Sequence, residues 1–469
     1  MRSIFAAPAI ILCAAAPIQA CAAQAVPIPD TPAGRYASAF LDAFNSADAA
    51  RLERYNALYG RRTPPQDWID LHAMTGRLTP VRVDSSDPNS ITLLLSAEQG
   101  DAFWQSSARI DPADPMKVVE AALGRADRPP EFAIPRLPRA ELHRQMADRL
   151  ARDVASDRFV GTMIVSRHGR TIYQNASGLA DREANIPVTM DTRFRIGSAN
   201  KMFTAIAILQ LVEAGRIALD APIGTYLTDY PNPDFAGSVT VRQLLTHSGG
   251  AGDIFTPEYE ARRLEVRTLA DYVSLFGHRA QDIGEGRNFY SNYGFVLLGR
   301  IIEVVSGQDY YAYVEDRIFR PAGMNDTASL PENVDVPNRS RGYAKRQSRL
   351  VDNEDTLPFR GTAAGGGYTT AADFVRFGEA LRSGRLLSRE MVDQATSPQR
   401  PDGWYGFGFF LGGQGRTRHW GHGGGAPGMN AAFRVFPELD AIVVALANLD
   451  PQAADSQADF YANRMALDE

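Results

Sequence analysis

A serine and a lysine stand three residues apart at the start of an apolar segment. Ser198 and Lys201 precede a stretch that is hydrophobic nearly all round and that Gly215 can end, a pattern typical of a buried helix. Residues at i and i+3 lie on one helical face, so the two side chains can meet. A serine hydroxyl needs a base to become a nucleophile. Burial and the positive end of a helix disfavour the charged form of a lysine. The pair therefore predicts an acyl-enzyme on Ser198 with Lys201 as base.

The alternative interpretation is that Ser198 caps a helix and Lys201 lies on the surface. A Ser-x-x-Lys pattern is weak evidence on its own. The chain, however, contains only three lysines among its 49 basic residues, and these are Lys117, Lys201 and Lys345. Arginine stays protonated in proteins and cannot act as a base. A lysine at this position therefore favours the catalytic interpretation.

Two triplets follow later in the chain. Tyr290-Ser291-Asn292 precedes a helical pattern over 293–305, and Ser291 or Asn292 could simply cap that helix. His422-Gly423-Gly424, followed by Gly425, lies between two strand-like segments and by itself predicts a glycine-rich turn. His419 and His422 are three residues apart without a third ligand nearby. We therefore expect no metal site and no cofactor.

In this order the three motifs resemble those of the serine β-lactamase and penicillin-binding-protein superfamily. Over residues 139–450 the chain is most similar to the class C β-lactamase-related serine hydrolases, a group that includes D-alanyl-D-alanine carboxypeptidases, D-aminopeptidases and β-lactamase-like esterases. The resemblance implies that Tyr290 exchanges a proton with Lys201 and protonates the leaving group. It implies a substrate-binding set made up of Asn292, His422, Gly424 and Gly425.

The resemblance also implies that the backbone N–H of Gly425 lies opposite that of Ser198, as an oxyanion hole. Segments 244–249 and 365–370 resemble recurring family segments, and His247 in the first is expected to be structural. One departure concerns the β-lactamase pattern, which has lysine and threonine where this chain has His422 and Gly423. Because a histidine with an unperturbed pKa near ~6.5 is mostly neutral at pH 7, recognition of a substrate carboxylate is in doubt.

The expected function is therefore hydrolysis of small esters, amides or D-amino-acid peptides. Activity should rise with pH as Lys201 loses its proton, with an added dependence from His422. Two alternatives stay open. The protein could bind or hydrolyse β-lactams, or it could be a non-turnover binding or sensor protein that accepts an acyl group, a role for which an extra N-terminal domain would be suited.

Composition excludes one class of partner. The 469 residues carry a net charge of −6, and the charges are scattered without a basic stripe. Nucleic acid is therefore not an expected partner.

Residues 1–25 carry the features of a signal peptide. Arg2 is followed by an apolar run over 4–17 and by the small-x-small site Ala23-Gln24-Ala25. The run is too short and too rich in alanine for a membrane span, and no other stretch predicts a transmembrane segment. We expect an exported, periplasmic or secreted protein. A plain N-terminal helix is one alternative, and a lipid anchor at Cys21 is another, although Gln19 fits the lipoprotein pattern badly.

The elements that must position these motifs predict an α+β chain with two domains. Residues 26–128 show helical periodicity over 33–60 and 68–74, then strand patterns at 78–83, 91–95, 103–110 and 118–123. This order resembles the small cone-shaped nuclear-transport-factor-2-like domains. A proline-rich linker, 129–138, follows.

Residues 139–469 form the expected β-lactamase-like hydrolase domain. A helix over 140–154 and a hairpin over 159–175 precede a mostly helical region, and strand patterns recur at 416–420, 430–436 and 441–446. Strands at both ends with helices between them predict one antiparallel sheet built from both ends of the domain and flanked by a helical region.

Overall fold

The computed structural model describes residues 25–282, 290–346 and 349–468. The chain divides into two compact units that meet between Pro135 and Arg136, inside the predicted linker. The predicted signal peptide, with the lipid-anchor candidate Cys21, lies outside the described residues except for Ala25. Within the described part of the chain, no helix is both long and apolar enough to cross a bilayer.

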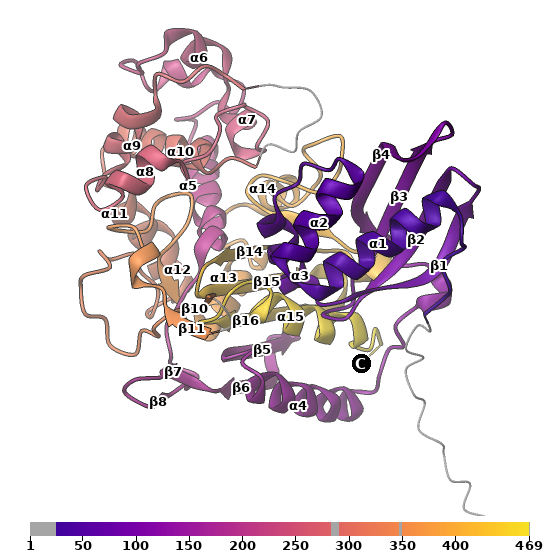
Figure 1. Cartoon of the computed structure of the whole chain (residues 1–469). Helices are drawn as coiled ribbons and strands as arrows, with labels where there is room; N and C mark the ends of the chain where they lie inside the picture. The colour runs from indigo at the N-terminus through magenta and orange to yellow at the C-terminus, as the bar shows by residue number, and fades with distance from the viewer. Residues whose placement is uncertain (1–24, 283–289, 347–348, 469) are drawn as a thin grey trace, which may run out of the picture. The chain divides into compact units, whose positions relative to one another are not determined.

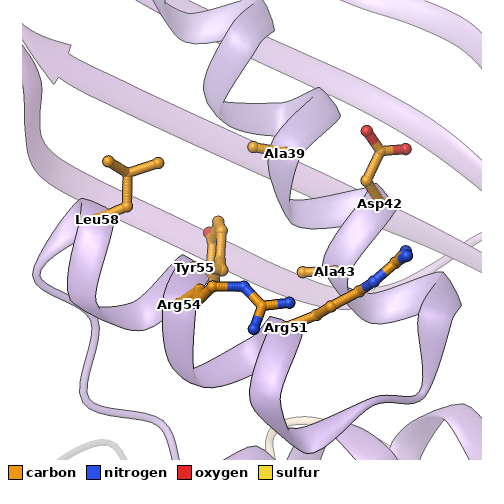
Figure 2. Close-up of a pocket in the computed structure, with 7 residues that line it drawn as sticks. All are labelled: Ala39, Asp42, Ala43, Arg51, Arg54, Tyr55 and Leu58. Carbon is orange, nitrogen blue, oxygen red and sulfur yellow. The ribbon is translucent and has the colours of Figure 1, made fainter.

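In the first unit, three helices precede, along the sequence, the strands of a four-stranded antiparallel sheet (Figure 1). The helices are α1 (Pro32–Ser46), α2 (Ala49–Tyr59) and α3 (Pro65–Thr75), and the strands, in sheet order, are β1 (Leu78–Ser86), β2 (Ser90–Ala97), β3 (Phe103–Asp111) and β4 (Asp114–Ala126). Between α1 and α2 an open hollow of about 290 Å³ is lined by Ala39, Asp42, Ala43, Arg51, Arg54, Tyr55 and Leu58 (Figure 2). The likeness to nuclear-transport-factor-2-like domains stays a prediction.

The second unit contains a six-stranded antiparallel sheet in the order β13-β14-β15-β16-β5-β6. Along the chain, the first two strands of this sheet are β5 (Gly161–Arg167) and β6 (Arg170–Ser177), which follow helix α4 (Arg139–Ala155). The last four strands along the chain are β13 (Phe410–Gly412), β14 (His419–Ala426), β15 (Met429–Phe436) and β16 (Ala441–Ala447). Strand β16 pairs with β5, Ala445 opposite Met163. The prediction of one sheet built from both ends of the domain is confirmed.

Helices cover both faces of this sheet (Figure 1). Strand β15 alternates its side chains, as strands do. Phe433 lies against α13 (Ala371–Arg382) at Gly378, whereas Asn430 and Arg434 contact Asp455 of α15 (Ala453–Arg464). The two helices therefore lie on opposite faces of the sheet.

The predicted strand over 416–420 differs from the structure. Residues Gly415–Thr417 form a 3₁₀ turn, and strand β14 begins at His419 and continues through the glycines to Ala426. Glycine weakens a strand because it is flexible and has no side chain to pack. Here, however, Gly423, Gly424 and Gly425 each pair with a residue of β15, and this pairing holds them in the sheet.

The expected helix-rich region lies, along the sequence, between strands β6 and β13. Its helices are α5 (Lys201–Glu213), α6 (Pro233–Ser238), α7 (Val241–Leu245), α8 (Pro257–Arg262), α9 (Leu269–Phe276), α10 (Asn292–Ser306), α11 (Tyr310–Val314), α12 (Arg320–Ala322), α13 and α14 (Arg389–Ala395). Three short strands precede α5, namely β7 (Leu179–Asp181), β8 (Ile186–Pro187) and β9 (Phe194–Arg195). Three more lie between α12 and α13, namely β10 (Tyr343–Arg346), β11 (Arg349–Asp352) and β12 (Tyr368–Thr369).

Helix α5 is the centre of this region. Nearly all its residues are buried, as its uniformly apolar sequence predicts. Phe203 is fully buried and packs edge-on against Phe319 and Phe377, at centroid distances of 5.0 and 4.9 Å.

We expect Phe203→Ala to lower the free energy of unfolding by about 3–5 kcal/mol, because the surrounding side chains cannot fully close the cavity. Urea unfolding followed by circular dichroism measures the change. Phe255→Ala removes the same atoms from a side chain that is 61% exposed and should change the free energy by no more than about 0.5 kcal/mol. Similar losses in both variants would contradict the central position of α5.

Candidate active site

Ser198 lies in a tight turn that leads into helix α5. Residues Gly197–Asn200 form a 3₁₀ turn, and the α-helix begins only at Lys201. Gly197 has a φ of 49°, a left-handed conformation that favours glycine. Ser198 is partly exposed, whereas its neighbours in the turn are buried. The Ser198 hydroxyl therefore lies at the edge of the buried core that surrounds the turn.

The Lys201 side chain is fully buried and reaches back to Ser198. Its Nζ lies 3.3 Å from Ser198 Oγ, donates to Asn292 Oδ1 at 2.6 Å, and donates to the carbonyl oxygen of Ala364. A neutral amine has two N–H donors and one lone pair. Since two acceptors take the two hydrogens, the lone pair is left for the serine hydroxyl. This is the arrangement a general base requires.

Burial also changes the protonation of Lys201. Desolvation lowers the pKa of its ammonium from 10.5 to about 7, and the negative charge of Asp253 opposes part of that shift. A substantial fraction of Lys201 is therefore neutral near pH 7. An amine of ordinary pKa would be almost wholly protonated there.

Tyr290 lies beside both Ser198 and Lys201. Its hydroxyl shares a hydrogen bond with the Ser198 side chain, and its ring centroid lies 4.6 Å from Lys201 Nζ. Burial raises the pKa of Tyr290 well above its usual range, although the Ser198 hydrogen bond acts in the opposite direction. The phenol therefore keeps its proton and can donate it.

Helix α10 presents Asn292 to Lys201. Of the two predicted capping residues, Ser291 is the one that caps: its Oγ accepts from the N–H of Gly294 at 2.9 Å. This leaves the Asn292 amide free of any capping role. Its Nδ2 donates to Asp253 at 2.9 and 3.2 Å, so its Oδ1 must face Lys201.

Sequence reasoning missed Asp253. This acid lies in an irregular loop with no helical or strand pattern around it, and its partner Asn292 is 39 residues away. The only available signal was its position shortly after the family-like segment 244–249.

His247 contacts the ring of Tyr290 and the backbone of Ser291. It is 1% exposed, its Nδ1 accepts the backbone N–H of Ser291 at 3.0 Å, and its ring centroid lies 4.3 Å from that of Tyr290. Desolvation lowers the pKa of His247 well below its usual value. A neutral imidazole therefore holds Tyr290 and Ser291 in place.

The glycines of β14 lie directly against the turn that carries Ser198. A Cβ placed on Gly424 would lie 1.8 Å from the carbonyl oxygen of Ile196, and one on Gly197 would lie 3.0 Å from the backbone nitrogen of Gly425. From the other side, Gly366 donates its N–H to the carbonyl oxygen of Gly197 at 3.1 Å. The structure therefore brings all three predicted motifs together around Ser198.

His422 differs from the expectation. The side chain is 2% exposed, its Nε2 lies 3.1 Å from the Tyr405 hydroxyl, and its Nδ1 donates to the carbonyl oxygen of Gly423. Desolvation, helped by the charge of Lys201, lowers the pKa of His422 to about 3. His422 stays neutral from pH 5 to 9, so the predicted pH dependence from this residue is wrong. Because both its ring nitrogens have protein partners, we revise its role from substrate contact to support of Tyr405.

Residues capable of holding a metal do not converge here. Across residues 25–282, 290–346 and 349–468, no three His, Cys, Asp or Glu side chains are grouped as metal ligands.

Comparison with known proteins identifies the family. The sequence model of the Beta-lactamase family matches residues 146–468. Esterase EstB of Burkholderia gladioli is 30% identical over 54% of this chain and 75% of its own length. A penicillin-binding protein from Bacillus halodurans superposes with a TM-score of 0.61 at 32% identity, over 68% of this chain and 99% of its own.

A D-amino acid amidase from Ochrobactrum anthropi superposes with a TM-score of 0.58 at 26% identity, over 68% of this chain and 96% of its own. The chain belongs to the Beta-lactamase family of serine hydrolases, and the predicted superfamily is confirmed.

The rate at which a fluorophosphonate labels Ser198 should rise about tenfold per pH unit and level off above about pH 7, the pKa of Lys201. The neutral base accumulates over that range. A single titration is expected, with no step from His422. Asp253→Asn removes the negative charge that raises the pKa of Lys201, so the midpoint should move to lower pH.

The matched control is Asp234→Asn, which makes the same change at an exposed position on α6. It should leave the midpoint in place. A midpoint that stays or moves upward in Asp253→Asn would contradict this account of the lysine.

Proposed function

We propose that this member of the Beta-lactamase family is an exported serine hydrolase that cleaves small esters or amides, including those of D-amino acids and their peptides, through an acyl-enzyme on Ser198. The observation that carries the proposal is the position of Lys201 Nζ, 3.3 Å from Ser198 Oγ, with Asn292 and Ala364 placed to accept both hydrogens of the neutral amine.

In the acylation step, Ser198 Oγ attacks the substrate carbonyl carbon and its proton passes to Lys201 Nζ. The carbonyl oxygen becomes an oxyanion between the backbone N–H groups of Ser198 and Gly425, a type of stabilisation that is often the largest single contribution to catalysis. The bond to the leaving group then breaks. Tyr290 gives its proton to the leaving group and recovers one from Lys201.

Deacylation uses the same groups in reverse. A water molecule attacks the acyl carbon and gives a proton to the Tyr290 and Lys201 pair. The oxyanion forms again in the same place, and the ester bond to Ser198 breaks. Ser198 Oγ recovers a proton, so the enzyme returns to its starting state.

The surroundings of His422 support esters and amides over penicillins. Its buried, neutral imidazole uses both nitrogens within the protein, so it offers a substrate carboxylate neither charge nor a free donor. The partly exposed rings of Trp404 and Phe410 lie 5.4 Å apart and continue to Tyr290. Such an apolar wall suits an uncharged acyl group. The esterase and D-amino acid amidase relatives are consistent with this choice.

The proposal that the protein is exported depends on residues 1–25, which combine a basic start, an apolar run and a small-x-small site. A lipid anchor at Cys21 is the alternative route to the same side of the membrane. The destination is the periplasm or the medium.

The proposal is tested with a panel of nitrophenyl esters of short acids, D-amino-acid amides, D-Ala-D-Ala peptides and a chromogenic cephalosporin. We expect turnover of esters or amides well above that of the cephalosporin. Ser198→Ala should abolish it. Turnover by Ser198→Ala equal to that of the unaltered protein would overturn the proposal.

Lys201→Arg should lower kcat by about 10²–10⁴-fold, because arginine cannot accept the serine proton and general-base catalysis contributes a factor of this size. Lys345→Arg makes the same change at an exposed position on β10 and should retain full activity. Steady-state rates with the best ester measure both. Rapid labelling of Ser198 without turnover of any substrate would instead favour the acyl-accepting sensor.

A further inference from the structure

A buried asparagine on β15 holds the peptide group between Gly424 and Gly425. Asn430 is 1% exposed and lies opposite Gly425 in the β14–β15 register. Its Nδ2 donates to the carbonyl oxygen of Gly424 at 2.9 Å. This contact is additional to the hydrogen bonds of the strand ladder.

The first turn of α15 fixes the orientation of the Asn430 amide. Its Oδ1 accepts the backbone N–H groups of Ala454 and Asp455 at 2.7 and 3.1 Å, and its Nδ2 also donates to Asp455 Oδ2 at 2.9 Å. A flipped amide would turn its NH₂ group toward two N–H donors. The NH₂ group must therefore face Gly424.

Asp455 is itself held in place. Its carboxylate accepts from Arg434 at 3.3 Å, and Arg434 also bonds Asp459 at 2.9 Å. The restraint on Asn430 thus comes from a network of partly buried groups on the face of the sheet that α15 covers.

The peptide group that Asn430 holds is the one that carries the Gly425 N–H. The carbonyl of Gly424 and the N–H of Gly425 lie in one plane and point in opposite directions. A bond that fixes the oxygen therefore fixes the direction of the N–H. It also polarises the peptide, because hydrogen bonds in a chain strengthen one another. Pairing with β15 already holds this peptide in the sheet, and the bond from Asn430 adds a second restraint, on its carbonyl oxygen.

We propose that Asn430 is a positioning residue for the oxyanion hole, aiming and strengthening the Gly425 N–H from the far side of its peptide group. This inference rests on the proposed function, in which that N–H receives the oxyanion beside Ser198. Asn430 touches neither the substrate nor the reacting atoms.

The test compares Asn430→Ala with the unaltered enzyme on an ester and on the matching thionoester, in which sulfur replaces the carbonyl oxygen. Complete removal of an oxyanion donor costs about 10²–10³-fold in kcat. A donor that is present but misaimed should cost about 10–100-fold, with KM changed by less than about threefold. Because sulfur accepts hydrogen bonds weakly, the thionoester should lose much less, and the ester-to-thionoester rate ratio should fall about tenfold.

The ratio does not depend on how much of the variant is folded, since both rates come from the same active molecules. Asn448→Ala is the matched control: this residue is 2% exposed and its Nδ2 donates to the carbonyl oxygen of Arg341 at 2.8 Å, so its loss is a comparable structural defect. Its ratio should stay unchanged. If Asn430→Ala does not fold, Asn430→Ser, which is too short to bridge α15 and Gly424, takes its place with the same expectation.

Equal losses on the two substrates, or an unchanged kcat, would reduce Asn430 to a structural residue and overturn the inference. Failure of the proposed function is distinguishable, because the unaltered enzyme would then show no turnover that depends on Ser198.

Discussion

The catalytic unit depends on keeping one amine out of water and beside a serine hydroxyl. A buried ammonium without partners would cost several kcal/mol, and the lowered pKa of Lys201 removes much of that cost by letting the group become neutral. The neutral amine then needs two acceptors and a hydroxyl at fixed positions. Asn292 and Ala364 supply the acceptors from two segments that are distant in sequence from α5. The helical cap at Ser291 and the contact between Asn292 and Asp253 can be understood as ways to hold the Asn292 acceptor still.

The same constraint explains why glycine surrounds Ser198. The turn at Gly197 and the strand at Gly424 approach each other so closely that a methyl group on Gly424 would collide with the carbonyl oxygen of Ile196, and Gly366 bonds the same turn through its N–H. In the proposed mechanism, close backbone packing lets main-chain N–H groups, rather than long side chains, face the substrate carbonyl. Main-chain donors carry little conformational freedom and therefore need little reorganisation during the reaction. The network of Asn430, Asp455 and Arg434 extends this rigidity to the layer behind the strand.

Local pattern was sufficient to predict the parts of the site that are encoded in consecutive residues. The apolar run after Lys201 predicted a buried helix, and the strands at the two ends of the domain predicted the sheet. Three features could not be predicted, for a shared reason: each depends on which residues meet in space. The burial of His422 follows from its contact with Tyr405. The orientation of Asn292 follows from Asp253, and the glycines of β14 form a strand because β15 pairs with them. The spacing of residues along the chain does not indicate such contacts.

The pairing of β16 with β5 has a consequence for how the molecule is made. The hairpin of β5 and β6 leaves the ribosome early, yet the partner for the inner edge of β5 arrives only with Ala441–Ala447, near the end of the chain. Long-range strand pairing of this kind is slow, because the intervening loop must close before the contact is gained. Until then a buried, apolar strand edge stays open to other unfinished chains. Nascent and C-terminally shortened molecules should therefore be the forms that aggregate or require a chaperone.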